Sequence, residues 1–414
     1  MKTSKQFSIL QVLIIIIIAY SVMPIVSRIF SMYFTTYAYL FVMVAAFSII
    51  IIVKGQNFVQ QTFAVIVPLL IMQIIVYVIT KPSPVMWVYT LILDVVPLIL
   101  GCYIIKFESV INKKIIFYAL LLAVGITAVT TIIGLQIYPN AARYLATVAD
   151  PYEEENVRYN LMNIGGYEFT YMVTLLYPAI IYGYKRKRIH FAILVSYAIL
   201  TFLLIINSGY TISLLLFIVS TIFVFFKRDI KVIEIVFVLI VALIFIYVLF
   251  PLFSELLLGL SKIIDNKDIS ERLEALSGGR EGLANSDDDR WGLYMISINS
   301  IIKSPIFGGL FVGFSSSGHS FILDFVAQYG LLGAISLYLI YRAVYTKFFA
   351  PYKKEKAYGY VFWCFLQTII LSTINTGMWL TLLTLFLPII FEFINDKGEE
   401  HENIVDSKRL TKQV

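Results

Sequence analysis

DDDRWGLYMISINSIIKSPIFGGLFVGFSSSGHSFILDFVAQYGLLG, residues Asp287 to Gly333, is the stretch around which the rest of the chain is organised. It concentrates an Arg, a His, three adjacent Asp and a run of Gly and Ser between two apolar segments. Apolar side chains in its first half recur every three or four residues, which is the spacing of one helix face. That face comprises Trp291, Tyr294, Met295, Ile298, Ile301 and Ile302. The spacing predicts an amphipathic helix that lies on the membrane.

Signals at both ends delimit this predicted helix. The acids Asp287–Asp289 stand where helix N-caps and first-turn carboxylates belong. Pro305 and Gly308 stop the helix. A turn rich in Gly and Ser follows, and His319 stands at the beginning of the next apolar segment. A surface helix, a polar turn and a His at a helix entrance together indicate a candidate reaction site.

The composition of the whole chain is that of a multi-spanning membrane protein. Its 414 residues are 60% hydrophobic and 14% charged, with a mean hydropathy of +0.86. Cys102 and Cys364 both lie in apolar segments, so neither a disulfide framework nor a cysteine metal site is indicated. The net charge of +6 lies mainly between apolar runs, which is the pattern of membrane topology rather than of nucleic-acid binding.

The apolar runs predict about twelve membrane-spanning helices. Their expected limits are 8–27, 33–53, 62–80, 86–105, 115–137, 167–184, 189–207, 210–226, 232–252, 320–345, 358–374 and 377–395. Most Lys and Arg lie in segments between spans that are on the same side of the membrane as the N-terminus. Both termini are therefore expected in the cytoplasm. The first apolar run would also suit a signal peptide, but no small-residue cleavage site follows, which favours an uncleaved span.

The expected organisation is therefore all-α, in four parts. Residues 1–252 hold the first nine spans, and 253–319 form a long extracytoplasmic loop that contains the amphipathic helix. Residues 320–395 hold the last three spans, and 396–414 form a polar cytoplasmic tail.

The central stretch also resembles the signature of the O-antigen polymerase and O-antigen ligase family. The shared pattern is an Arg, an aromatic residue, a Pro, a Gly pair, a polar turn, a His and Gly-Leu-Leu-Gly. The residues that carry it are Arg290, Tyr294, Pro305, Gly308, His319, Gly330 and Gly333. The family pattern has Ser-Gly before the Arg and Asn after the His, whereas this chain has Asp288-Asp289 and Ser320.

This resemblance implies a GT-C-like fold and a Wzy-type polysaccharide polymerase. Such an enzyme joins oligosaccharide repeat units carried on a polyprenyl pyrophosphate, at the outer face of the cytoplasmic (inner) membrane of a bacterium. The implied partners are the lipid-linked oligosaccharide, the bilayer, and the flippase and chain-length regulator of the same pathway. Neither a cofactor nor nucleic acid is expected. An abundance of Ile and Lys favours capsule over lipopolysaccharide synthesis.

The resemblance implies roles for the basic residues. Arg290 would bind the pyrophosphate leaving group, because a guanidinium is permanently charged and bidentate. His319 would orient or deprotonate the acceptor hydroxyl, because its charge changes near neutral pH. Arg158 and Arg280 are further pyrophosphate candidates, and the spacing to Pro305 favours Arg290 over Arg280 as the motif Arg. Three of these residues also have a structural interpretation. Arg290 could pair with the adjacent Asp residues or with lipid headgroups, His319 could be a helix-capping or surface histidine, and Arg158 could be an interfacial anchor.

Other polar residues carry weaker predictions. Glu168 and Tyr294 are candidate contacts to the acceptor sugar. Asp94 lies in the middle of the expected span 86–105, where a carboxyl group is either functional or paired within the helix bundle. The adjacent acids Asp287–Asp289 favour helix capping over metal binding, so no metal is expected.

Two alternative functions stay open. A ligase of the same family would use the same donor and transfer the glycan to another acceptor. A lipid-linked oligosaccharide flippase would suit the number of spans, and Asp94 would then couple transport to an ion. The chain has no phosphate-binding loop of the ATPase type. A long charged loop and the lack of a visible repeat between halves argue against a transporter.

Overall fold

The computed structural model describes residues 9–34, 37–107, 110–147, 150, 152–225, 258–259, 262, 290–310, 317–355 and 357–395. These residues are predominantly helical, and none of them belongs to a β-strand. The expected span 232–252, the predicted acids Asp287–Asp289 and the C-terminal tail lie outside the described residues.

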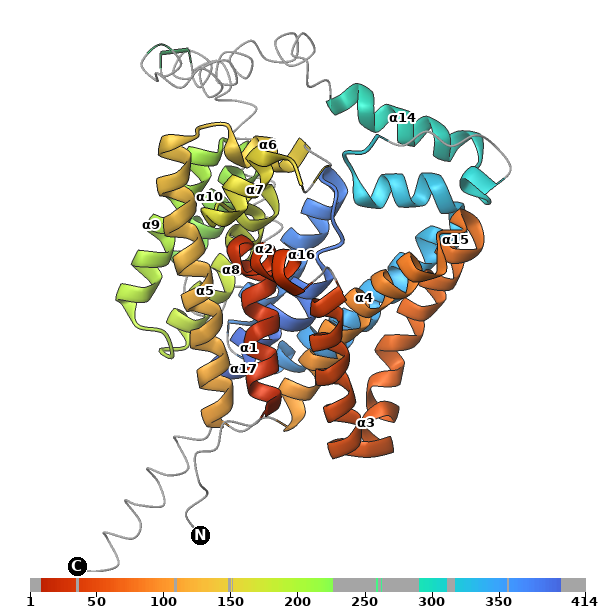
Figure 1. Cartoon of the computed structure of the whole chain (residues 1–414), viewed down its shortest axis with the longest axis horizontal. Helices are drawn as coiled ribbons and strands as arrows, with labels where there is room; N and C mark the ends of the chain where they lie inside the picture. Colours follow the sequence, from red (N-terminus) through yellow and green to blue (C-terminus); the bar gives the residue numbers. More distant parts are fainter. Residues whose placement is uncertain are drawn as a thin grey trace, which may run out of the picture.

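The helices follow one another along the chain and form a bundle (Figure 1). They are α1 (Ile9–Val22), α2 (Pro24–Phe34), α3 (Tyr37–Thr80), α4 (Pro84–Phe107), α5 (Val110–Ile137), α6 (Ala141–Thr147), α7 (Glu154–Leu161), α8 (Tyr167–Lys185), α9 (Phe191–Ser208), α10 (Thr211–Phe225), α14 (Arg290–Lys303), η1 (Gly308–Leu310), α15 (Phe321–Val344), η2 (Tyr345–Phe349), η3 (Ala350–Lys354), α16 (Tyr358–Ile374), η4 (Leu382–Phe386) and α17 (Leu387–Asn395).

The lengths and hydropathies of these helices support a membrane protein. Within the described residues, 5 helices are long and apolar enough to cross a membrane, or up to 6 if a bent pair counts as one span. Further apolar helices have only 10–17 residues. The all-helical class is therefore confirmed, whereas the expected number of about twelve spans stays a prediction.

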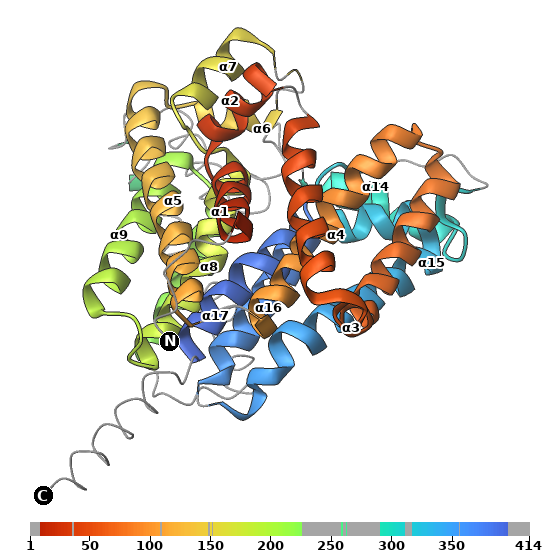
Figure 2. The ribbon, with the colours of Figure 1, turned by 60° about the horizontal axis from the view of Figure 1, so that its bottom comes forward.

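Helix α8 lies inside the protein. Every residue from Phe169 to Gly183 is buried, including Thr170 and Thr174. The helices α9, α10, α16 and α17 pack against it, and Figure 2 shows it beside α9 and α17. Because protein surrounds it on all sides, α8 needs no continuous lipid-facing apolar stripe, and it accommodates threonine and tyrosine hydroxyl groups.

Two of the expected spans are broken in the structure, and two neighbouring ones are joined into one kinked helix. The expected first span 8–27 ends at Val22, and the chain bends by 105° into α2. The two expected spans 33–53 and 62–80 are joined through Gly55, whose φ of 64° interrupts α3. The expected span 320–345 corresponds to α15, which is interrupted at Gly330 with a φ of 59°. Positive φ angles suit glycine, because it has no Cβ to clash with the backbone.

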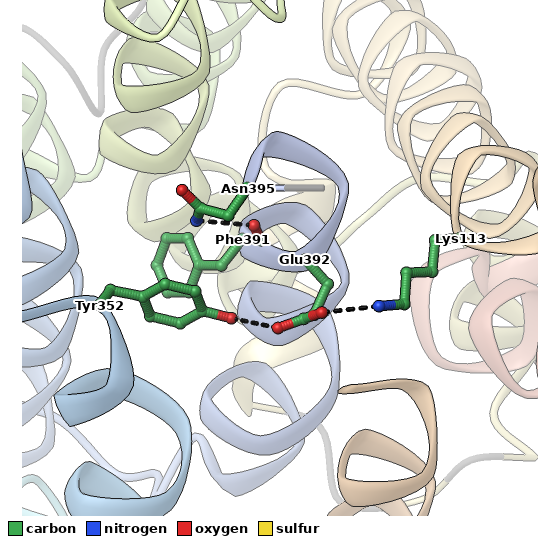
Figure 3. Close-up of polar contacts among 5 residues, drawn as sticks. All are labelled: Lys113, Tyr352, Phe391, Glu392 and Asn395. Carbon is green, nitrogen blue, oxygen red and sulfur yellow. Dashed lines mark hydrogen bonds and ion pairs between the residues drawn. The ribbon is translucent and has the colours of Figure 1, made fainter. Parts of the chain in front are cut away.

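One end of the bundle is held by a partly buried ion pair. Lys113 Nζ lies 2.7 Å from Glu392 Oε2, and the Tyr352 hydroxyl donates to Glu392 Oε1 at 2.6 Å (Figure 3). One turn further on, Asn395 donates to the Phe391 carbonyl at 2.9 Å. The Glu392 carboxylate thus ties α5, η3 and α17 together near the start of α5. Helix α14 lies at the other end of the bundle (Figure 1).

Candidate functional site

The last two residues of α16 and the non-helical residues that follow them connect several elements at this other end of the bundle. We call Thr373 to Trp379 the 373–379 segment. Helix α16 itself ends at Ile374, and Trp379 has a φ of 54°, which is unusual for a bulky residue. The Trp379 ring packs edge-on against Tyr171 of α8 with centroids 6.0 Å apart. Non-glycine residues held in this conformation cluster at functional sites, so the segment is a natural place to look for one.

Helix α14 and the start of α15 are both attached to the 373–379 segment. The Tyr294 hydroxyl donates to the carbonyl of Ile374 at 2.8 Å. The Ser320 hydroxyl donates to the carbonyl of Thr373 at 2.6 Å, and the backbone N–H of Phe321 donates to the carbonyl of Asn375 at 2.9 Å. These bonds use carbonyl groups that have no partner within α16, because the last turn of a helix leaves them unpaired.

Helix α8 reaches the same segment from a third direction. The hydroxyls of Tyr167 and Thr376 lie 3.3 Å apart, and the Tyr167 hydroxyl also lies 3.3 Å from Glu168 Oε1. Glu168 is exposed in the first turn of α8. A carboxylate with an exposed surface is available to a ligand, so the expected role of Glu168 as a sugar contact is compatible with its position.

His319 stands in a turn directly before α15. The described part of that turn, Ser317 to Ser320, has buried serines at its ends and a half-buried His319 between them. The backbone N–H of His319 donates to the Ser317 hydroxyl oxygen at 3.0 Å. Gly318 has a φ of 67°. The turn is thus fixed through its backbone, while the imidazole keeps an accessible surface.

A carboxylate that the sequence analysis did not single out fixes this turn. Asp324 lies in the first turn of α15, and its Oδ1 atom accepts from the Ser317 N–H at 2.9 Å and from the Ser317 hydroxyl at 2.8 Å. The Ser297 hydroxyl of α14 donates to the same oxygen. The signal in the sequence was an acid within an otherwise apolar run, five residues after His319.

The glycines of the family-like pattern have a geometric role. A Cβ on Gly308 would lie 2.4 Å from the Gln328 carbonyl oxygen, and one on Gly330 would lie 2.3 Å from the Ile306 carbonyl oxygen. The N–H of Leu331 donates to that Ile306 carbonyl at 3.1 Å. The two chain segments therefore cross at backbone contact, which only glycine permits.

Arg158 lies in a neighbouring cluster on α7. Its guanidinium stands over the rings of Tyr138, at 5.0 Å, and Tyr159, at 5.5 Å, and lies 3.6 Å from Glu155. The pKa of Arg158 is raised, first by a hydrogen bond with Tyr159 and also by the nearby Tyr138 and Glu155. With 43% of its side chain exposed, this guanidinium is charged, oriented by aromatic rings and accessible.

Asn163 fixes the loop between Arg158 and α8. Its φ is 56°, and its side-chain amide donates to Thr130 at 3.0 Å and to Thr127 at 3.2 Å, both on α5. Its Oδ1 atom accepts from the backbone N–H of Ile25 at 3.2 Å. A single buried amide therefore connects α2, α5 and the loop that joins α7 to α8.

The predicted site residues divide into three groups. Tyr294, His319 and Glu168 belong to elements that converge on the 373–379 segment, whereas Arg158 belongs to the α7 cluster. Arg290 begins α14, but its side chain and the whole of Arg280 lie outside the described residues.

Asp94 is the remaining acidic candidate within the described residues, and it pairs with Gln73 rather than with the residues above. Asp94 Oδ2 accepts a hydrogen bond of 2.6 Å from Gln73, and the carbonyl of Gln73 accepts from the Trp87 indole at 3.0 Å. This pairing between α3 and α4 supports the packing interpretation of Asp94. Within the described ranges, no three His, Cys, Asp or Glu side chains are grouped as metal ligands would be.

Neither protein-family models nor curated protein sequences match the chain.

Proposed function

We propose that this protein is a glycosyltransferase that polymerises oligosaccharide units carried on a polyprenyl pyrophosphate, at the outer face of the bacterial cytoplasmic membrane. The observation that carries the proposal is the convergence of three elements on the 373–379 segment. Tyr294 of α14 and the turn of His319 bond to it directly, and Glu168 adjoins it through Tyr167. A partly exposed imidazole, a carboxylate and hydroxyl groups at one end of an apolar bundle suit a sugar acceptor beside a membrane.

The proposed reaction transfers the growing glycan from its lipid carrier to the next unit. The bond between the anomeric carbon and the pyrophosphate oxygen breaks, and the electron pair leaves with the polyprenyl pyrophosphate. An acceptor hydroxyl oxygen forms the new bond to that carbon, and its proton passes to the His319 imidazole. Arg158, with Arg290 and Arg280 as further candidates, would stabilise the charge on the departing pyrophosphate.

The positions of α14 and Arg158 are consistent with these proposed roles. Helix α14 buries Ser297 against the protein but leaves Ile302 69% exposed, as expected for a helix that faces lipid on one side. A lipid-linked substrate approaching along that surface would reach the turn of His319. Arg158 is accessible and held by rings, which suits a guanidinium that binds phosphate oxygens without large rearrangement.

The test is turnover by purified protein in lipid vesicles given a lipid-linked repeat unit. A ladder of lengthened products is expected with the wild type and not with His319→Ala. His190→Asn is the matched control, because His190 caps α9 through its ring nitrogen and asparagine is also a good N-cap. Product formed only after addition of a second acceptor would instead indicate a ligase. Movement of lipid-linked glycan between leaflets without any covalent product would contradict the proposal.

A further inference from the structure

The geometry points to Asp324 as a positioning residue, which holds the turn of His319 and fastens it to α14. The inference deepens the proposed function and rests on it, because it assigns Asp324 the task of placing the proposed general base. Asp324 does not itself touch substrate in this scheme. It acts through Ser317 and Ser297.

One oxygen atom of Asp324 serves two separate elements. Asp324 Oδ1 accepts the Ser317 N–H at 2.9 Å and the Ser317 hydroxyl at 2.8 Å, and it also accepts the hydroxyl of Ser297. Ser297 is fully buried and Ser317 is 6% exposed. Three hydrogen bonds to this one oxygen therefore hold Ser317 and Ser297 against α15.

The hydrogen-bond network continues from Ser317 to His319. The Ser317 hydroxyl donates to Asp324 and accepts the backbone N–H of His319 at 3.0 Å. Beyond His319, the hydroxyl of Ser320 accepts the N–H of Leu323 and donates to the 373–379 segment. The backbone of His319 is thus held on both sides. On the N-terminal side Asp324 shares the hold with Ser297, whose hydroxyl oxygen also accepts the Ser317 N–H at 2.9 Å.

The network also includes α14. Ser297 lies one turn after Tyr294, whose hydroxyl is bonded to Ile374. The carboxylate of Asp324 therefore connects the helix expected to meet the lipid-linked substrate with the turn that carries the imidazole. Gly308, which follows α14 in the chain, also contacts the backbone of Gly330 in α15. These contacts make α14 and the turn of His319 a single structural unit.

The experiment compares Asp324→Ala and Asp324→Asn in the polymerisation assay. Loss of the acceptor should lower kcat by roughly tenfold or more while KM for the lipid-linked unit changes by less than about twofold, because a displaced base affects the chemical step rather than binding. Asparagine retains an acceptor oxygen at the same position, so Asp324→Asn should recover a substantial part of kcat. Tyr352→Phe is the matched control, because it removes one hydrogen bond to a carboxylate at the opposite end of the bundle.

A second measurement does not depend on activity. Amide hydrogen exchange at Ser317 and His319 should be faster in Asp324→Ala than in the wild type, since both N–H groups belong to this network. Unchanged exchange would overturn the inference, and so would an unchanged kcat or a rise in KM alone. If the wild type itself makes no product, the proposed function fails, and the exchange data still decide whether Asp324 holds the turn.

Discussion

Gly308 and Gly330 cross so closely that neither position has room for a side chain. A Cβ on Gly308 would lie 2.5 Å from the Gly330 nitrogen, and a Cβ on Gly330 would lie 2.6 Å from the Gly308 nitrogen. Both residues also have positive φ angles. The pair thereby sets the position of α14 relative to α15, and with it the position of the turn that carries His319.

The first prediction concerns this crossing. Gly308→Ala should destabilise the protein by roughly 3 kcal/mol or more, because the methyl group forces the backbones apart in addition to straining φ. Gly55→Ala is the matched control, because Gly55 has a similar φ of 64° and nothing within 4 Å of an added Cβ. It should cost only about 1–2 kcal/mol. Equal losses in thermal or denaturant unfolding in detergent would show that the crossing does not constrain the structure.

The sequence could predict the local elements of this region but not their connection. The start of α14 near Arg290 and its end before Pro305 follow from periodicity and from helix-stop residues. By contrast, the break at Gly330 depends on contact with Gly308, so the run 320–345 reads as one continuous span. Periodicity likewise cannot show that Asp324 reaches Ser297, because that contact is made between different helices.

The second prediction concerns Asn163, which combines a positive φ with buried hydrogen bonds to α5 and α2. Asn163→Ala should cost more than about 2 kcal/mol, since the Ile25 N–H loses its side-chain acceptor, the Thr130 hydroxyl loses one donor and alanine is strained at this φ. Asn163→Gly loses the same bonds without the strain. It should therefore be less destabilising than Asn163→Ala by about 1 kcal/mol in unfolding measurements. A larger loss with glycine would contradict the assigned backbone geometry.

The third prediction tests the ion pair at the opposite end. The side chains of Lys113 and Glu392 are 11% and 17% exposed. Lys113→Met should cost about 3 kcal/mol, because it leaves the Glu392 carboxylate poorly compensated. The double variant Lys113→Met with Glu392→Gln should recover part of this loss. A double-mutant cycle of unfolding free energies measures the coupling, and additive losses would mean that the two side chains act independently.

The fourth prediction concerns Arg158 in the proposed reaction. Arg158→Ala should lower turnover roughly a hundredfold, and Arg158→Lys should recover only part of it, because an ammonium group cannot bind phosphate oxygens in the same bidentate way. Arg143→Lys, on the exposed surface of α6, is the control and should keep its turnover. Full turnover in Arg158→Ala would remove this residue from the proposed pyrophosphate site.

The last prediction concerns the orientation of the bundle, on which the proposed reaction depends. Glu154 is exposed on α7, toward the same end of the bundle as α14 (Figure 1), and Lys353 is exposed on η3 beside the Glu392 pair. The native Cys102 and Cys364 are buried, so they should contribute little background to thiol labelling. In intact cells, a membrane-impermeant maleimide should label Glu154→Cys, whereas Lys353→Cys should react only after lysis. The reverse pattern would place Tyr294, His319 and Glu168 in the cytoplasm. A glycan donor that is already outside could not then reach them, so the proposed polymerase reaction would fail even if the site geometry were correct.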